Sequence, residues 1–377
     1  MTSCATVKRL VLPNWQLWLL ATIVLFSGFL QRGPWPADEP RFTLVAQQMV
    51  ASGDYWFPHR GVEIYPDKPP VLMWLQAGLY HLTGSWDAAF LLPSLLAGLG
   101  TLLLVFDLSL RLFGARSARI STLALLLTVH FSYQFKKAQI DPLLVFFVTL
   151  SVYALIRHLL LGSKQRWLFI GAFFAGVGVI TKGVGVIALL IFVPYFLAKR
   201  LQANGLPKNS ALRQGAAWQA ALLVLAGFLL PIALWLGPLL WQVHSAPSPE
   251  RLAYLQNILF KQTAQRFAAA WHHQQGPLYF PQVMLTTWMP VIFVLPWALR
   301  GWWRRLHGVN SVVSFRKPDA RYLILLGWVL CVFVFFSLSK GKRDMYILPA
   351  LPMLAVISGP ALVLALRKTG FHVLCYS

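Results

Sequence analysis

Ten long apolar blocks constrain this chain more than any other feature of its sequence. A helix needs roughly 20 apolar residues to cross a bilayer, and fewer where neighbouring helices pack around it. The blocks are Leu17–Leu30, Ala88–Leu110, Ile120–Phe131, Pro142–Ile156, Trp167–Ile180, Val184–Leu197, Ala216–Val243, Leu278–Leu299, Tyr322–Leu338 and Tyr346–Leu366. We therefore predict an all-α, polytopic integral membrane protein with about ten spans, and we note Pro231 as a candidate break inside the seventh block.

The composition supports this prediction and excludes a nucleic-acid-binding protein. Hydrophobic residues make up 58% of the chain and charged residues only 12%, against about 25% charged residues in soluble domains. The net charge is +22, but the lysines and arginines punctuate the apolar blocks instead of gathering on one face. We therefore expect membrane lipids as partners and no binding of nucleic acid.

The charges also predict an orientation. When alternate connections are assigned to opposite sides, starting with the N-terminus in the cytoplasm, 20 of the 33 lysines and arginines lie inside and nine of the eleven acids outside. This agrees with the positive-inside rule, and the reverse orientation violates it. We expect both termini in the cytoplasm.

The chain reads as a single membrane domain over residues 1–377, without an internal repeat. The first apolar block lacks a small-x-small cleavage site and is followed by nine others, so we interpret it as a retained anchor. The three cysteines, Cys4, Cys331 and Cys375, offer no pair outside the membrane and imply no disulfide framework.

The first outside loop, residues 31–87, differs from the rest of the chain. Phe42, Val45, Ala46, Met49 and Val50 share one face of a helix that would begin near Pro40 and end at Gly53. A second helix is expected from the Pro69-Pro70 pair to about Gly84. Such amphipathic helices lie on a membrane rather than cross it.

Acids and bases gather at the starts of both helices. Asp38, Glu39 and Arg41 open the first helix, and Asp67 and Lys68 precede the second. Helix capping and a solvated turn are the structural alternatives to a functional role for these groups. Two such clusters in one loop favour a site more strongly than either cluster alone.

The later outside connections are short but charged. They carry Lys136, Lys137 and Asp141, then Lys182 beside Gly183, then Lys340. Charges at membrane depth are costly and tend to be functional, although snorkelling lysines are the alternative. A cationic pocket at this surface would suit a phosphate-bearing lipid. The second outside loop, residues 244–277, adds His272 and His273, which are a weak metal signal on their own.

These residues together resemble a known family. The matching segments are Asp38-Glu39-Pro40-Arg41-Phe42, Ser52-Gly53-Asp54-Tyr55-Trp56-Phe57-Pro58-His59, Tyr65-Pro66-Asp67-Lys68-Pro69-Pro70, Ile140-Asp141-Pro142, Thr181-Lys182-Gly183, Tyr279-Phe280-Pro281, Phe336-Ser337-Leu338-Ser339-Lys340-Gly341-Lys342 and Tyr346-Ile347-Leu348-Pro349. In this order they resemble the aminoarabinose transferase and protein mannosyltransferase family. These are membrane glycosyltransferases of the GT-C fold class, which use polyprenyl-phosphate-linked sugars.

The resemblance implies a reaction and a set of roles. A sugar would move, with inversion, from a polyprenyl-phosphate donor to an extracytoplasmic glycolipid such as lipid A, a polysaccharide or a protein. The roles implied fall into two groups: Asp38, Glu39 and Asp141 at the reaction centre, and Arg41, Lys68, Lys182, Lys340 and Tyr346 around the donor phosphate.

The family also implies a divalent metal ion. Asp67 with His272 or His273 would hold it, although the family commonly has the longer Glu where this chain has Asp67. No nucleotide-binding motif is visible, in agreement with a lipid-linked donor. The resemblance places the protein in the bacterial inner membrane, with the active site on the extracytoplasmic side.

One departure from the family affects the expected activity. Its members are usually longer, whereas this sequence stops soon after the tenth block, so we expect no C-terminal soluble domain. An inactive truncated homologue is therefore one alternative. A polytopic transporter is another, but it would favour polar residues at the midplane and two related halves, which the sequence does not show.

Overall fold

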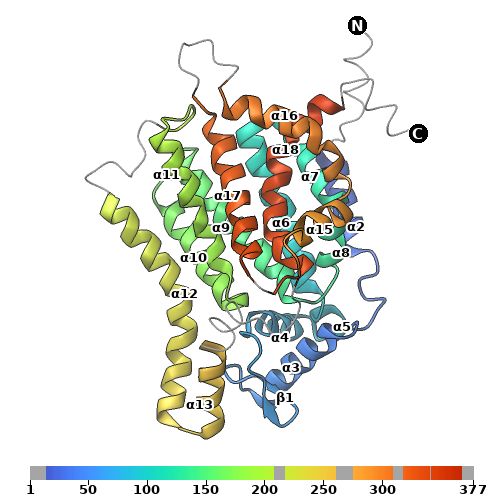
Figure 1. Cartoon of the computed structure of the whole chain (residues 1–377). Coiled ribbons are helices and arrows are strands. Elements are labelled where there is room, and N and C mark those ends of the chain that lie inside the picture. The colour runs from blue at the N-terminus through green and yellow to red at the C-terminus, as the bar shows by residue number, and fades with distance from the viewer. Residues whose placement is uncertain (1–13, 208–216, 260–274, 309–316, 340, 367–377) are drawn as a thin grey trace.

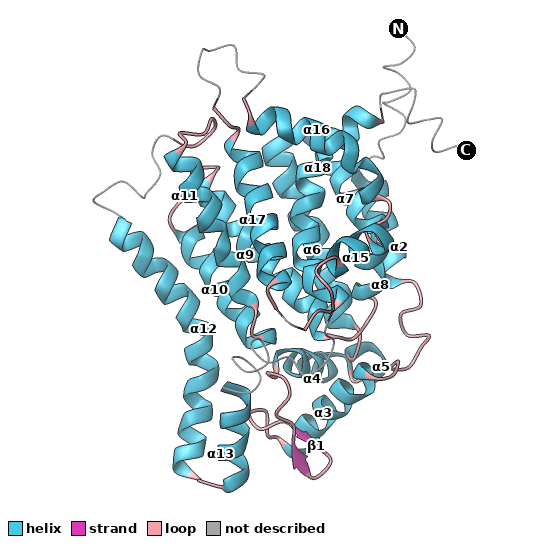
Figure 2. Cartoon of the chain, viewed as in Figure 1, coloured by secondary structure: helices cyan, strands magenta, loops and turns pink. Residues whose placement is uncertain are grey.

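The computed structural model describes residues 14–207, 217–259, 275–308, 317–339 and 341–366, and over these residues the protein is a bundle of helices (Figure 1). The only sheet in this part of the chain is a hairpin of β1 (His59–Arg60) and β2 (Glu63–Ile64), paired antiparallel (Figure 2). The all-α prediction is confirmed for these residues.

The helices are of three kinds: upright helices that run along the bundle, 3-10 segments, and helices outside these two sets. The upright helices are α2 (Asn14–Phe26), α6 (Leu92–Phe113), α7 (Ala115–Leu127), α9 (Ile140–Leu159), α10 (Arg166–Lys182), α11 (Phe192–Arg200), α12 (Ala217–Ser245), α17 (Ala320–Ser337) and α18 (Leu351–Ala365). The 3-10 segments η1 (Gly185–Ile191) and η4 (Asp344–Ala350) lead into α11 and α18. The remaining helices are α3 (Asp38–Ser52), α4 (Val71–Thr83), α5 (Trp86–Ala89), α8 (Val129–Phe135), α13 (Pro249–Gln256), α15 (Tyr279–Thr287) and α16 (Leu295–Leu306), with η3 (Val291–Val294) before α16.

Helix α18 lies at the centre of the bundle and α12 at its edge. Within the most apolar 18-residue window of each stretch, 89% of the residues are buried in Asp344–Ala365, which contains α18, but only 22% in α12. Because the exposed residues of α12 are mostly leucine, alanine and tryptophan, that helix has the surface expected for contact with lipid. One hydrophobic core cluster contains residues from α2 through to α18.

Small residues bring α10 and α12 into close contact. A Cβ atom added at Gly176 would lie 2.3 Å from the carbonyl oxygen of Phe228, and one added at Gly227 would lie 2.6 Å from that of Phe169. Each glycine therefore faces the backbone of the other helix. Such reciprocal packing is the usual way for helices to associate in lipid, where burial of apolar surface gives little driving force.

The structure supports a multi-pass membrane protein without confirming ten spans. Length and apolar character single out five helical stretches, among the described residues, that could each cross a bilayer: Trp86–Phe113, Ile140–Leu159, Ala217–Ser245, Ala320–Ser337 and Asp344–Ala365. The α15–α16 pair adds a sixth if it counts as one bent span. By contrast α2 and α7 have 13 residues each, or about 20 Å, against about 30 Å of hydrocarbon.

Three predicted blocks differ from the helices observed. Ile120–Phe131 is divided between α7 and α8 because Thr128 is extended, with ψ of 120°. Leu278–Leu299 is broken, with a bend of 104° between Tyr279–Thr287 and Val291–Leu306. The candidate break at Pro231 does not occur, since α12 is continuous through both of its prolines. Prolines are tolerated in membrane helices when local adjustments satisfy the freed carbonyls.

Candidate active site

The first loop forms the two helices that the sequence predicts. Helix α3 ends at Gly53, which adopts a φ of +73° and donates its N–H to Met49, and α4 follows Pro70 and ends at Gly84. The buried residues of α3 include the predicted Phe42 and Met49. Both helices lie beneath the same end of the bundle (Figure 1), so the acids and bases at their starts lie close to the ends of the spans.

Asp38 is held from two sides and remains open. Its Oδ1 accepts a hydrogen bond from Arg41 Nη2 at 2.6 Å, and its Oδ2 accepts one from Gln139 Nε2 at 3.2 Å. Gln139 is itself oriented by Gln134, whose Nε2 donates to its Oε1 at 2.6 Å. The N-cap of α3 is Ala37, without a side-chain cap. The side chain of Asp38 is 29% exposed and is therefore an oriented carboxylate that a ligand can reach.

Arg41 connects the two clusters of the first loop. Its Nη1 lies 3.9 Å from Asp67 Oδ2, and its guanidinium is 5.7 Å from the ring of Tyr65. Its Nε is buried and has no hydrogen-bond partner among the described residues. Lys68 follows Asp67 in the bend before α4. The Arg41 side chain is 28% exposed, and a guanidinium has five N–H donors, so Arg41 can contact an anion while it pairs with Asp38.

A second charged group lies at the ends of the spans. Lys182, the last residue of α10, forms a salt bridge with Asp141 in the first turn of α9. Its Nζ is also 5.3 Å from the ring centroid of Tyr346, in η4. The Asp141 side chain is 8% exposed and that of Lys182 is 14% exposed. Burying two charges costs desolvation free energy, which only a close and well-oriented ion pair can offset. The salt bridge between Lys182 and Asp141 is therefore a specific feature of the fold.

The start of α9 connects these two groups. Gln139, which contacts Asp38, is the N-cap of α9, and Asp141, which contacts Lys182, lies two residues later. The structure therefore brings Asp38, Arg41, Asp67, Asp141, Lys182 and Tyr346 to one end of the bundle from five separate parts of the chain. We call this set the polar cluster.

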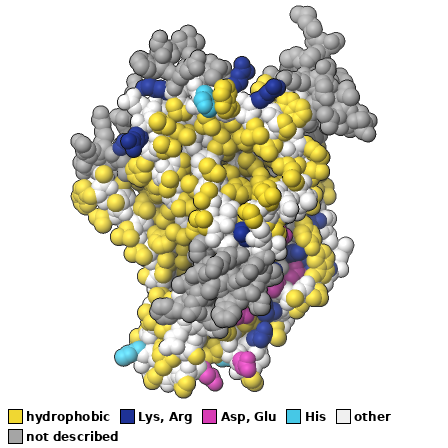
Figure 3. All heavy atoms as spheres, viewed as in Figure 1, with side chains coloured by type: hydrophobic (Ala, Val, Ile, Leu, Met, Phe, Trp, Pro, Cys, Tyr) yellow, Lys and Arg dark blue, Asp and Glu magenta, His cyan; other side chains and the backbone are white. Residues whose placement is uncertain are grey.

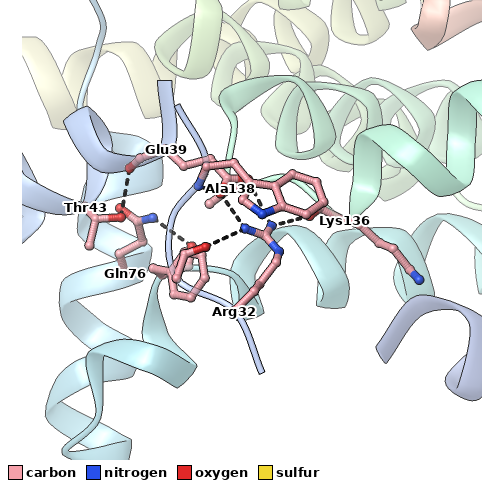
Figure 4. A network of polar contacts seen from close by, with 9 residues as sticks. Arg32, Glu39, Thr43, Gln76, Lys136 and Ala138 are labelled. Atoms are coloured by element: carbon pink, nitrogen blue, oxygen red, sulfur yellow. Dashed lines mark hydrogen bonds and ion pairs between the residues drawn. The ribbon is translucent and has the colours of Figure 1, made fainter. Parts of the chain in front are cut away.

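Glu39 differs from its neighbour Asp38 because its contacts are structural. Its carboxylate accepts two hydrogen bonds from Arg32, at 2.6 and 3.0 Å. It also accepts the backbone N–H of Trp35 at 2.6 Å and that of Ala138 at 2.8 Å. Figure 4 shows this network, in which Arg32 also donates to the carbonyl of Lys136. Glu39 is 2% exposed, so its geometry suits anchoring the loop to the bundle better than the predicted place at the reaction centre.

The metal prediction has little support from the residues described. His272, His273 and the predicted donor-binding Lys340 lie outside them. Asp67 is 46% exposed and its nearest charged partner is Arg41, a cation that competes with a metal ion for the carboxylate. Among the described residues, no three His, Cys, Asp or Glu side chains are grouped to hold a metal.

The structure adds polar residues that the sequence did not single out. Gln139 orients Asp38, and Arg32 binds Glu39. His130 is 3% exposed, and its Nδ1 accepts the indole N–H of Trp288 at 3.0 Å, while its buried Nε2 has no partner. Gln139 is an uncharged amide and His130 lies inside an apolar block, so neither stands out in the sequence as a site residue. Their hydrogen bonds to distant residues are seen only in the folded chain.

Comparisons with known proteins identify relatives of nearly the whole chain. The family model described as dolichyl-phosphate-mannose-protein mannosyltransferase matches residues 67–235. The undecaprenyl phosphate-alpha-4-amino-4-deoxy-L-arabinose arabinosyl transferase of Pseudomonas paraeruginosa is 31% identical over 367 residues, covering 94% of this chain and 60% of that protein. The chain is thus similar to the aminoarabinose transferase and protein mannosyltransferase family. A relative with the same name in Aeromonas hydrophila is 27% identical, covering 90% of this chain and 58% of that protein.

Solved structures support the GT-C-type fold of this family. ArnT from Cupriavidus metallidurans, in a crystal structure bound to undecaprenyl phosphate, is similar with a TM-score of 0.73 and 24% identity, over 92% of this chain and 59% of that one. The Archaeoglobus fulgidus oligosaccharyltransferase is similar with a TM-score of 0.61 and 14% identity, over 96% of this chain and 51% of that one. The chain thus spans about six-tenths of the length of the family's aminoarabinose transferases.

Proposed function

We propose that this chain is a glycosyltransferase that moves a sugar from a polyprenyl-phosphate donor to an extracytoplasmic acceptor. The observation that carries the proposal is the polar cluster, in which an oriented and accessible Asp38 shares one end of a membrane bundle with Arg41 and Lys182. The similarity to the family and the names of the relatives support it. The acceptor class is a glycolipid such as lipid A, a glycan or a protein.

The proposed chemistry is a single displacement with inversion. The acceptor hydroxyl attacks the anomeric carbon while the bond from that carbon to the phosphate oxygen breaks, and polyprenyl phosphate leaves with both electrons of the bond. Asp38 takes the proton of the attacking hydroxyl, as a general base. If the acceptor is itself a phosphate, no strong base is needed, and Asp38 then positions the reacting groups.

The leaving phosphate requires positive charge where negative charge develops. Arg41, which is partly exposed beside Asp38, is the first candidate, and Lys68 and Lys182 are the next. Tyr346 would close the same space from η4. Lys340 remains a prediction for the same role, as does a metal ion held by Asp67 with His272 or His273.

The membrane orientation is part of the proposal. Apart from Asp107 and Asp319, the acids lie at the end of the bundle that holds the polar cluster, and most of the described basic residues of the predicted cytoplasmic connections belong to the other end (Figure 3). The positive-inside rule then places the polar cluster on the extracytoplasmic side of the inner membrane and both termini in the cytoplasm. The loops 31–87 and 244–277 would form the outer surface of one membrane domain.

The direct test is a transfer assay with the reconstituted protein. Vesicles containing the chain receive polyprenyl-phosphate aminoarabinose or mannose, together with lipid A, a polysaccharide or a peptide, and the release of free polyprenyl phosphate is followed. Donor-dependent release with one acceptor class supports the proposal. No release in any combination, with donor still bound, favours an inactive homologue, and sugar flux across the vesicle without transfer favours a transporter.

Gln139 gives a prediction about the geometry of the proposed base. Gln139→Ala removes one hydrogen bond to Asp38, so the carboxylate samples more orientations. Because a hydrogen bond to a charged group contributes about 1.5 kcal/mol or more, we expect the transfer rate to fall by at least about tenfold, with little change in donor binding. Single-turnover kinetics with saturating donor measure this. An unchanged rate would show that Gln139 does not position Asp38.

A further inference from the structure

Helix α16 lies across the end of the bundle opposite the polar cluster. Figure 1 shows it near the ends of α17 and α18, at the end where α7 begins. It cannot continue α15 as a straight span, because the chain bends by 104° between Tyr279–Thr287 and Val291–Leu306. A helix in this position runs along the boundary between lipid and water.

One face of α16 is fixed to the bundle. Ala298 and Trp302, four residues apart, are buried, and the indole N–H of Trp302 points to the carbonyl of Ile357 in α18 at 3.4 Å. The carbonyl of Arg305 accepts the backbone N–H of Asp319, just before α17, at 3.1 Å. These contacts fix the rotation of α16, so that its opposite face points away from the bundle.

The outward face combines apolar and cationic side chains at helical spacing. Leu299 is 53% exposed and Trp303 is 58% exposed, and the exposed arginines Arg300 and Arg304 lie beside them. Arg305 is also exposed, but it lies at the edge of the bundle-facing side, with its guanidinium 6.0 Å from the ring of Tyr322. Tryptophan is the residue that prefers the headgroup level of a bilayer. An exposed stripe of this composition is typical of interfacial helices.

The charge of this face has no counterpart on the protein. Within the described residues, none of Arg300, Arg304 and Arg305 lies within ion-pair distance of a carboxylate. The acids nearest to this end in the fold, Asp107 and Asp319, pair with Arg111 and Arg321. Helix-dipole compensation explains basic residues in the last turn, but it does not explain Arg300 or the exposed Trp303.

We infer that α16 is a docking surface for anionic phospholipid in the leaflet at this end of the bundle. The guanidinium groups would bind headgroup phosphates, for which the arginine fork is well suited, and Leu299 and Trp303 would enter the acyl boundary. The partner class follows from the charge complementarity and from the position of the helix. This inference does not depend on the proposed glycosyltransferase activity.

The experiment compares lipid retention in two variants of equal charge. The full chain is purified in mild detergent, incubated with equal amounts of phosphatidylglycerol and phosphatidylcholine, and examined by native mass spectrometry. The test variant combines Arg300→Gln, Arg304→Gln and Arg305→Gln. The control combines Lys164→Gln, Arg166→Gln and Arg200→Gln, which removes the same charge from exposed residues elsewhere.

We expect the test variant to lose at least about tenfold of its preference for phosphatidylglycerol, while the control retains it. Equal retention in both variants, or equal loss in both, would overturn the inference, since the second result would show only a bulk charge effect. If the triple variant is not monodisperse, Arg304→Gln alone is compared with Arg200→Gln, and a smaller loss in the same order is expected.

Discussion

Asp38→Asn is expected to reduce sugar transfer by at least about 100-fold, the lower end of the usual contribution of a general base. The amide cannot accept the proton of the acceptor hydroxyl, and it cannot pair ionically with Arg41, which lies 2.6 Å away. The substitution is nearly isosteric and the side chain is 29% exposed. The protein should therefore fold normally and still bind the donor.

The matched control for this variant is Asp87→Asn. Asp87 is an exposed acid in the same loop, and it lies far from the polar cluster along the chain. Transfer by this control should equal that of the wild type. If Asp38→Asn transfers sugar within about threefold of the wild-type rate, below the contribution of any general base, Asp38 is not the base.

Glu39→Ala should have its largest effect on stability. The substitution removes the acceptor of two hydrogen bonds from Arg32 and of the backbone N–H groups of Trp35 and Ala138. Arg32, 15% exposed, is left as a largely buried cation without its partner. Breaking a buried pair in this way typically costs about 3–5 kcal/mol. Thermal unfolding in detergent should show a clear fall in Tm.

Glu63→Ala is the control for the stability prediction. Glu63 lies in β2 of the same loop and is exposed, so its loss should change the free energy of unfolding by no more than about 0.5 kcal/mol. A Tm for Glu39→Ala equal to that of Glu63→Ala would contradict the structural role of Glu39. Adjacent acids should therefore fail in different ways, one in catalysis and the other in folding.

The loop helices could be predicted from the sequence because their signals are local. The apolar face of α3 recurs within one segment, and Gly53 and Gly84 end the two helices with the positive φ that glycine adopts most easily. The division of Ile120–Phe131 could not be predicted, because Thr128 carries no turn signal. The bend after α15 and the continuity of α12 likewise depend on neighbouring helices.

The site was predictable in its charges but not in its partners. Asp38, Arg41, Asp141 and Lys182 were singled out by charge and family pattern, and the fold brings them to one end. Asp38 and Glu39 had the same predicted role, because the groups that bind Glu39 include Ala138, 99 residues away. Contacts at such separation depend on the packing of the whole bundle.

A donor-binding experiment tests whether the polar cluster holds the phosphate of a polyprenyl-phosphate sugar. The wild-type protein, Arg41→Ala and Arg60→Ala are purified, incubated with a polyprenyl-phosphate sugar and compared by native mass spectrometry. Arg60 is an exposed arginine of the same loop outside the polar cluster. We expect one donor molecule bound to the wild type and to Arg60→Ala, and at least about tenfold less on Arg41→Ala, the loss expected for a charge-assisted contact with phosphate. Equal donor binding by all three proteins, or none by any, would show that Arg41 does not hold the donor phosphate.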